Sequence, residues 1–162
     1  MLPYAVTLIP TFLGWKLLGA YGSYYPLIVP SWFGGGAFNI FMLRQFYMTI
    51  PHELDEAAYM DGAGHLRIYF FILLPLIKSA LIVVGLFTFI RVWNDFLGPL
   101  VYLKTEKQFT LAIGLQQFVG QYTAQWHLLM AASTLVALPT VTIYLIGQRY
   151  FVEGIALTGL KG

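Results

Sequence analysis

The stretch that decides the fold runs from residue 51 to residue 69 and reads PHELDEAAYMDGAGHLRIY. It holds four of the chain's seven acidic residues, Glu53, Asp55, Glu56 and Asp61, and it lies between long apolar stretches. Charged side chains are costly inside a bilayer, so a segment with four of them is not expected to insert. This acidic segment, residues 51–69, is therefore predicted to be a polar helical element between membrane spans and the part of the chain that contacts another protein.

The composition is that of a membrane protein. Of the 162 residues 59% are hydrophobic and only 10% are charged, with a mean hydropathy of +0.73, whereas soluble domains carry about a quarter charged residues. Residues 17–43 and 108–148 contain no Asp, Glu, Lys or Arg, and roughly twenty apolar residues cross a bilayer as a helix. The absence of cysteine excludes disulfides and thiolate metal sites, and the net charge of +2 is too small to favour nucleic acid.

An all-α membrane domain over residues 1–162 with about four hydrophobic helices is expected. The four elements are residues 2–18, 27–47, 72–97 and 128–146, and residues 111–118 are predicted to form a short surface helix. The first apolar stretch ends after Trp15, about 22 Å of helix at about 1.5 Å per residue, which is short for a crossing. Either this helix is partial or the natural protein begins earlier. No basic residue precedes Lys16, so a charged secretory leader is not expected.

Glycine and proline mark irregular places in these elements. Gly34, Gly35 and Gly36 are consecutive, which weakens a helix but lets neighbouring backbones approach closely. We favour close helix packing over a pore role for them. Pro139 removes one backbone donor from the last element and is expected to kink it. Lys78 does not exclude a crossing, because its long side chain reaches a membrane face.

The basic residues indicate an orientation. If the acidic segment and the C-terminus share one side, that side holds five basic residues and the other side holds three. The five are Arg44, Arg67, Lys78, Arg149 and Lys161, and the three are Lys16, Lys104 and Lys107. The split favours a cytoplasmic acidic segment.

Within the acidic segment the sequence predicts a helix, a glycine turn and a second helix. Pro51 suits the first turn of a helix, and the acidic residues that follow lie near the positive end of the helix dipole. Gly62 follows Asp61 and is suited to positive φ, the usual way in which a helix stops. The second helix is expected to run from Gly64 toward Leu74, with a break at Pro75.

Two interpretations of this segment remain. It could be a solvated loop with helical character. Alternatively, it could dock into a groove on a partner, because four apolar residues alternate with the charges and give the helix a low-profile face. We favour docking; the four residues are Leu54, Ala57, Ala58 and Met60.

Enzymatic motifs are missing from the sequence. His52-Glu53 begins like a zinc-protease HExxH motif, but position 56 holds Glu56 where the second histidine is required. His65 and His127 are isolated in the sequence, and no glycine-rich phosphate loop with Lys and Ser or Thr occurs. We therefore expect no catalytic residue, no metal site and no bound cofactor in this chain, and no ATP hydrolysis by it.

Several motifs resemble one family. Glu56-Ala57-Ala58, Asp61-Gly62-Ala63, Ile72 and Leu74-Pro75 have the spacing of the EAA motif of bacterial ABC importer permeases. Residues 93–96 (WNDF), 148–152 (QRYFV) and 159–162 (GLKG) resemble the maltose-type second permease family of carbohydrate importers. The resemblance implies a MetI-like fold with typically six spans, of which this chain lacks the N-terminal ones.

The resemblance also implies a role for the acidic segment. Residues 51–71 would form cytoplasmic coupling helices that sit in a cleft of an ATP-binding subunit, where ATP and Mg are bound. The coupling residues implied are Glu56, Ala57, Ala58, Asp61, Gly62, Ala63, Leu74 and Pro75. Further implied partners are a second permease subunit, an extracytoplasmic sugar-binding protein and the lipid of the cell inner membrane. The C-terminal residues 153–162 would touch the ATP-binding subunit too.

Polar residues near the end of the third element are candidates for the substrate pathway. They are Arg91, Trp93, Asn94 and Asp95, and charges at bilayer depth usually face a cavity or a partner. An asparagine amide can hydrogen-bond a sugar hydroxyl, and an indole can stack on a sugar ring. An internal Arg91–Asp95 pair at i and i+4 of one helix face is an equally favoured interpretation.

Three functions are compared on this basis. The leading one is the transmembrane subunit of an ATP-driven sugar importer, which forms part of the pathway. The alternative is a truncated or accessory permease piece that binds the ATPase without a complete pathway. An intramembrane enzyme is disfavoured, because no acid–base pair or metal set is present.

Overall fold

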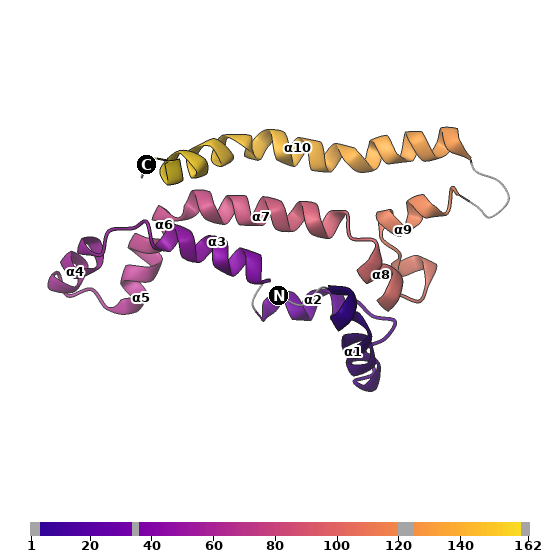
Figure 1. Ribbon diagram of the computed structural model, residues 1–162, viewed down its shortest axis with the longest axis horizontal. Coiled ribbons are helices and arrows are strands. Elements are labelled where there is room, and N and C mark those ends of the chain that lie inside the picture. The colour runs from indigo at the N-terminus through magenta and orange to yellow at the C-terminus, as the bar shows by residue number, and fades with distance from the viewer. Residues whose placement is uncertain (1–3, 34–35, 120–124, 160–162) are drawn as a thin grey trace. The chain divides into compact units, whose positions relative to one another are not determined.

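The computed structural model describes residues 4–33, 36–119 and 125–159, and within these ranges all regular elements are helices (Figure 1). Side chains are described for most of these residues, but not for Tyr4, Ala5, Arg149 or residues 151–159. The contacts divide the chain into two compact units. Unit 1 comprises residues 1–35 and 91–140, and unit 2 comprises residues 36–90 and 141–162.

Unit 1 is built around short helices. It contains α1 (Tyr4–Leu17), α2 (Tyr25–Trp32), α8 (Leu97–Tyr102), the 3-10 turn η2 (Glu106–Gln108) and α9 (Leu111–Gln116). Helix α2 packs against α8, and a Cβ at Gly98 would lie 3.2 Å from Leu27 Cδ2, so the small residue permits this contact. Tyr102, Leu103 and Ile113 form the buried core of the unit.

Unit 2 contains the acidic segment. Its helices are α3 (Ala37–Tyr47), α4 (Glu53–Met60), α5 (His65–Ile68), the π-helical turn η1 (Tyr69–Leu73), α6 (Leu74–Leu76) and most of α7 (Lys78–Trp93). The second half of α10 (Trp126–Gly159) also belongs to it. Buried side chains are Ala58, Ile68, Ile77, Ala80 and Val83. The amide of Asn39 on α3 donates to the Thr88 hydroxyl on α7 at 3.1 Å.

The expected second element, residues 27–47, lies within Tyr25–Tyr47, which is long and apolar enough to cross a membrane. The structure has α2 and α3 in its place, and the residue before α3, Gly36, has φ +96°. A positive φ is open to glycine but strained for other residues, so the backbone leaves the helical conformation there. A Cβ on Gly36 would meet nothing within 4 Å among the described residues, which does not support close packing at this position. Gly34 and Gly35 lie outside the described residues.

The expected third element, residues 72–97, is also interrupted. The helix breaks at Ile77, two residues after Pro75, and the segments His65–Leu76 and Lys78–Trp93 meet at 71°. The proline has no N–H to donate to the preceding turn, which weakens the helix at this point. Helix α7 ends at Trp93, so the expected end at residue 97 is four residues too late.

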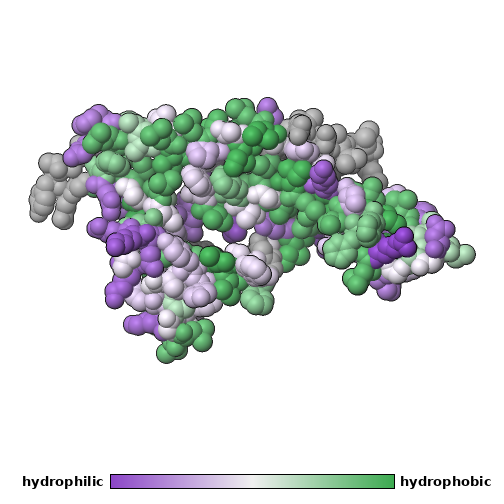
Figure 2. All heavy atoms as spheres, turned by 180° about the vertical axis from the view of Figure 1, so that it is seen from behind, coloured by the Kyte–Doolittle hydropathy of each residue, from purple (hydrophilic) through white to green (hydrophobic). Residues whose placement is uncertain are grey.

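The last expected element is longer in the structure than in the sequence analysis. Helix α10 has 34 residues and continues through Pro139 and into the C-terminal segment as far as Gly159. The short helix expected at residues 111–118 is present as α9. By length and composition, Tyr25–Tyr47 and Trp126–Gln148 could each cross a membrane, and the bent pair at Ile77 would be a third span if it is one broken span. Figure 2 shows the apolar side chains that cover much of one face.

Candidate functional site

The acidic segment forms a helical hairpin, which we call the acidic hairpin (residues 53–68, α4 to α5; Figure 1). Helix α4 begins at Glu53 after His52, and its first turn carries Glu53, Asp55 and Glu56, as predicted. These carboxylates lie near the positive end of the helix dipole, which stabilises them. Pro51 precedes this N-terminus rather than lying in the first turn, and its carbonyl accepts from the Leu54 N–H at 3.3 Å.

The turn of the hairpin is a Schellman motif. Gly62 has φ +77°, and its N–H donates to the Tyr59 carbonyl at 2.9 Å. The Ala63 N–H donates to the Ala58 carbonyl, also at 2.9 Å. These two bonds satisfy the last carbonyls of α4 and reverse the chain direction. A Cβ at Gly62 would meet nothing within 4 Å, so a larger residue would be opposed by backbone strain and not by a clash.

The predicted docking face consists of Leu54, Ala57, Ala58 and Met60, and all of these residues except Ala58 are exposed on the hairpin. Glu56 and Ala57 are exposed, and Met60 is 88% exposed. Ala58, by contrast, is only 7% exposed and packs into the chain itself. The two alanines of the motif therefore differ in exposure in this chain, and their contact with a partner stays a prediction. Ala63 in the turn is half-buried, whereas Asp61 and Gly62 are exposed.

A contact that the sequence analysis missed closes the hairpin. The Tyr59 hydroxyl and His65 Nδ1 are hydrogen-bonded across the turn, and the two rings meet edge to face with centroids 5.2 Å apart. In the sequence His65 has no adjacent histidine, cysteine or acidic residue that would mark it as part of a site. The sequence does, however, place Tyr59 and His65 three residues before and after Gly62, and this spacing could have indicated a contact across the turn.

Leu74 and Pro75 lie on α6 and not on the hairpin. Leu74 is half-buried and Pro75 is exposed. With Lys78 and Leu81 they line an apolar cavity of 380 Å³. The EAA-like residues therefore belong to two structural parts: an exposed hairpin, and a bent connection that leads into α7.

Two of the predicted pathway residues line a polar cavity in unit 1. This polar cavity has a volume of 270 Å³ and is lined by Leu27 and Ser31 of α2, Arg91 and Val92 of α7, and Asp95. Sequence reasoning missed Leu27 and Ser31, because they are about sixty residues away and no motif marks them. The cavity offers a cation, a carboxylate and a hydroxyl, which together can donate to and accept from a polar ligand.

The other polar groups at this end of α7 have local structural roles. Asp95 lies two residues beyond the end of α7, so it does not form an i to i+4 pair with Arg91 on one helix face. Its Oδ1 accepts from the Gly98 N–H at 3.1 Å, which caps the start of α8. The Trp93 indole N–H donates to the Val136 carbonyl on α10 at 3.0 Å. Asn94 is exposed in the turn after α7.

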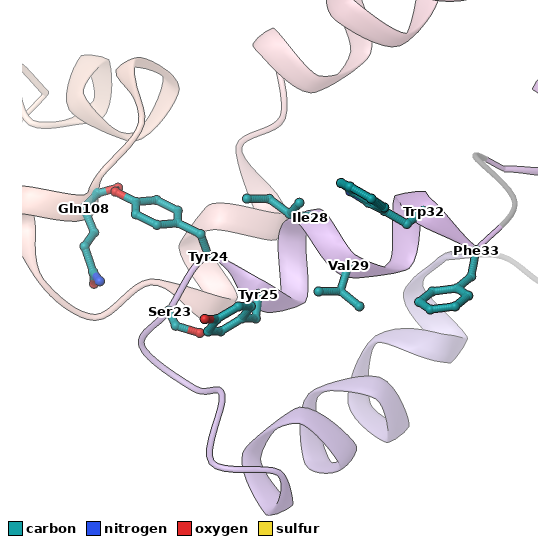
Figure 3. Close-up of a pocket in the computed structure, with 8 residues that line it drawn as sticks. All are labelled: Ser23, Tyr24, Tyr25, Ile28, Val29, Trp32, Phe33 and Gln108. Carbon is teal, nitrogen blue, oxygen red and sulfur yellow. The ribbon is translucent and has the colours of Figure 1, made fainter.

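A larger cavity of 530 Å³ in unit 1 was not predicted (Figure 3). Four of its lining residues are aromatic: Tyr24, Tyr25, Trp32 and Phe33. The side chains of Gln108 and Ser23 in its lining already have partners in the chain. Gln108 Nε2 donates to the Gly22 carbonyl at 2.9 Å, and the Ser23 hydroxyl donates to the Ala20 carbonyl at 2.6 Å. This aromatic cavity therefore offers mainly apolar contacts.

Comparison with known proteins identifies the family. Residues 1–156 match the family described as "Binding-protein-dependent transport system inner membrane component". The "Probable ABC transporter permease protein YurM" of Bacillus subtilis is 35% identical over 162 residues, which are 100% of this chain and 54% of YurM. The "Maltodextrin transport system permease protein MdxG" of Bacillus subtilis is 36% identical over 163 residues, 100% of this chain and 59% of MdxG.

A third relative and a solved structure agree with these matches. The "sn-glycerol-3-phosphate transport system permease protein UgpE" of Yersinia enterocolitica is 38% identical over 157 residues, 96% of this chain and 55% of UgpE. The fold is similar to a chain in the crystal structure of a bacterial ABC transporter involved in the import of the acidic polysaccharide alginate. That similarity has a TM-score of 0.74 with 26% sequence identity, and it covers 88% of this chain and 55% of the other.

The chain thus spans about half the length of the curated relatives that it matches. The expected all-α, MetI-like permease fold and the family resemblance are both confirmed. The chain belongs to the family of inner membrane components of binding-protein-dependent transport systems.

Proposed function

We propose that this chain is part of a transmembrane subunit of an ATP-driven sugar importer, and that the acidic hairpin couples it to a separate ATP-binding subunit. The observation that carries the proposal is the hairpin itself. Its EAA-like residues form a short helix ended by a Schellman turn at Gly62, with Glu56 and Ala57 exposed. An exposed carboxylate beside a small side chain suits close approach to a basic cleft.

The hairpin is suited to transmit movement. Its turn is fixed by two backbone hydrogen bonds, and the Tyr59–His65 contact joins the two helices across the turn. A rigid element at an interface passes on the displacement of its partner, whereas a flexible loop would absorb it. In this proposal the hairpin faces the cytoplasm, and ATP and Mg are bound by the partner subunit. A second permease subunit and an extracytoplasmic sugar-binding protein complete the transporter.

The sugar class of the substrate is supported by two observations. Two relatives are named as permeases of maltodextrin and arabinooligosaccharide transport systems, and the fold is similar to a chain of the alginate importer. In addition, the polar cavity combines Ser31, Arg91 and Asp95. A hydroxyl, a guanidinium and a carboxylate are suited to sugar hydroxyls, which both donate and accept hydrogen bonds. We propose that this cavity lies on the substrate pathway.

The coupling role is tested by Gly62→Leu in the assembled transporter. Leucine at φ +77° costs about 1–2 kcal/mol, and we expect stimulation of ATP hydrolysis by the loaded binding protein to be lost. Gly64→Leu is the matched control, because Gly64 has φ −76° and a Cβ there also meets nothing within 4 Å. Full stimulation in the Gly62 variant, with both variants inserted in the membrane at equal amounts, would refute the coupling role.

The pathway role is tested separately by Ser31→Ala. Removal of one hydroxyl from the polar cavity should raise the sugar concentration for half-maximal uptake about tenfold, because one hydrogen bond to the sugar is lost. Basal ATP hydrolysis should not change. Thr134→Ala is the control, since its hydroxyl donates to the Met130 carbonyl within α10 at 2.9 Å. If Ser31→Ala and the unmodified chain need the same sugar concentration for half-maximal uptake, the polar cavity is not part of the substrate pathway.

The alternative function is an accessory piece that binds the ATP-binding subunit without a complete pathway. The chain spans about half the length of the curated relatives that it matches, and both functions are therefore tested. The two functions differ in one measurement. An importer subunit supports accumulation of labelled sugar in vesicles, whereas an accessory piece co-purifies with the ATP-binding subunit but supports no accumulation.

A further inference from the structure

Unit 2 contains a cavity of 330 Å³ behind the acidic hairpin, which we call the Asp55 cavity. Arg44 and Tyr47 line it from the last turn of α3, and Asp55 lines it from α4. His52 and Leu73 contribute from the segment before α4 and from η1. His52 and Asp55 lie in the predicted coupling helices, but no lining residue named here is among the predicted coupling or pathway residues, so the proposed function leaves the cavity unexplained.

The carboxylate of Asp55 is the notable group of this cavity. Its Oδ1 is shielded from solvent, and it has no hydrogen-bond partner among the described residues. A shielded polar oxygen without a partner costs about 1–3 kcal/mol, and more if it is charged. Asp55 lies three residues before buried Ala58, on the side of α4 that faces the chain, whereas Glu56 is exposed. The carboxylate is therefore placed to receive a donor inside the cavity and not a partner at the exposed hairpin surface.

The cavity lies at the end of an apolar segment. The apolar segment Tyr25–Tyr47 could cross a membrane by length and composition, and it ends with a residue that lines the cavity. Tyrosine is enriched at membrane–water interfaces, because its ring is apolar and its hydroxyl is polar. The polar helix α4 follows within a few residues. If Tyr25–Tyr47 crosses the membrane, the cavity lies at the level of the lipid headgroups.

The charges around the cavity are of both signs. Arg44 is always positively charged, and His52 adds a ring nitrogen donor. Asp55 supplies a carboxylate that lacks a donor. A purely anionic headgroup would use Arg44 but would face Asp55 with like charge. A headgroup with an ammonium and a phosphate complements both ends.

We propose that the Asp55 cavity binds the headgroup of a phospholipid of the ethanolamine type. Its primary ammonium donates to the Asp55 carboxylate, and its phosphate accepts from Arg44 and His52. The apolar part of the lipid lies along Tyr47 and Leu73. A choline headgroup is a poorer ligand, because its quaternary ammonium has no N–H to donate.

The test measures lipid retained by the full chain. Chain purified from nanodiscs with equal amounts of phosphatidylethanolamine, phosphatidylcholine and phosphatidylglycerol is analysed by native mass spectrometry. We expect phosphatidylethanolamine adducts to dominate, and to weaken about tenfold in Asp55→Asn, because a hydrogen bond to a charged acceptor is lost. Glu53→Gln is the matched control, since Glu53 is on the same helix but does not line the cavity.

Two further arms guard against misinterpretation. Leu73→Trp fills the cavity without changing a charge and should also remove the adduct, whereas circular dichroism should report the helix content of the unmodified chain. Soluble glycerophosphoethanolamine added in excess should not displace the lipid, because it lacks the apolar part. Equal adducts in Asp55→Asn, a preference for phosphatidylglycerol, or displacement by the soluble headgroup would each overturn the proposal. So would binding to the cavity by a basic segment of the ATP-binding subunit.

Discussion

The acidic hairpin is held together by contacts between residues close in sequence, whereas α7 and α10 are joined by contacts between residues far apart in sequence. In the hairpin, the Schellman turn and the Tyr59–His65 contact join residues only a few positions apart. Between α7 and α10, Leu86 packs on Gly147 in unit 2, and the Trp93 indole donates to the Val136 carbonyl in unit 1. A change in the hairpin should thus alter the surface that a partner meets, whereas a change between the long helices should alter the stability of the chain.

Gly147→Leu should have the largest effect on stability. A Cβ at this position would lie 2.3 Å from Leu86 Cδ1 and 2.9 Å from Cδ2, so the Leu86 side chain or the helices must shift. Overpacking of this kind lowers the free energy of unfolding by about 1–3 kcal/mol. Unfolding in mixed micelles with rising SDS, followed by circular dichroism, measures the change.

The matched control for this variant is Gly85→Leu on α7, where a Cβ would meet nothing within 4 Å. It should leave the unfolding midpoint nearly unchanged. Leu86→Ala added to Gly147→Leu should restore part of the loss, because it removes the crowded atoms. Equal midpoints for the two glycine variants would show that the long-range contact does not stabilise the chain.

Trp93→Phe should have a smaller effect. It keeps an aromatic ring but removes the indole N–H that donates to the Val136 carbonyl at 3.0 Å. The net value of one hydrogen bond is about 0.5–1.5 kcal/mol, and we expect a loss of this size in the same unfolding experiment. The control is Trp126→Phe, since Trp126 is 61% exposed. If Trp126→Phe lowers the free energy of unfolding as much as Trp93→Phe does, the Trp93 indole hydrogen bond does not account for the loss.

Tyr59→Phe should have the smallest effect and should be confined to the hairpin. It removes the hydroxyl that bonds to His65 Nδ1, while both rings stay in place. Because both residues are exposed, we expect a loss below about 1 kcal/mol. Faster hydrogen exchange at the Gly62 and Ala63 amides, without a change in the SDS midpoint, is the expected result. A global shift in the midpoint would contradict the local character of the hairpin.

The hairpin could be predicted from the sequence because its determinants are local. The acidic first turn, the glycine at the end of α4 and the second helix all occur within residues 53–68, and each acts on its immediate neighbours. Which side of α4 is buried could not be predicted, because Ala57 and Ala58 are equally small and apolar. Only the packing of the chain distinguishes the exposed residue from the buried one.

The polar cavity shows the same limit at longer range. Arg91 and Asp95 can be identified in the sequence, because they are charged residues in an apolar stretch. Leu27 and Ser31 cannot, because only the folding of the chain brings them to the same cavity. The helix ends were misplaced for a related reason. The breaks at Gly36 and Ile77 depend on backbone angles, and hydropathy alone extends an apolar helix across them.

The exposed side of α4 is proposed to contact an ATP-binding subunit, and single cysteines test this contact directly. The chain has no cysteine of its own, so each substitution creates one unique thiol. Ala57→Cys and Met60→Cys, labelled with a thiol-reactive photo-crosslinker in the assembled transporter, should form covalent adducts with the ATP-binding subunit. Ala58→Cys, at a position that is 7% exposed, should form few. Adducts absent from Ala57→Cys and Met60→Cys, in a complex that still hydrolyses ATP, would contradict the account.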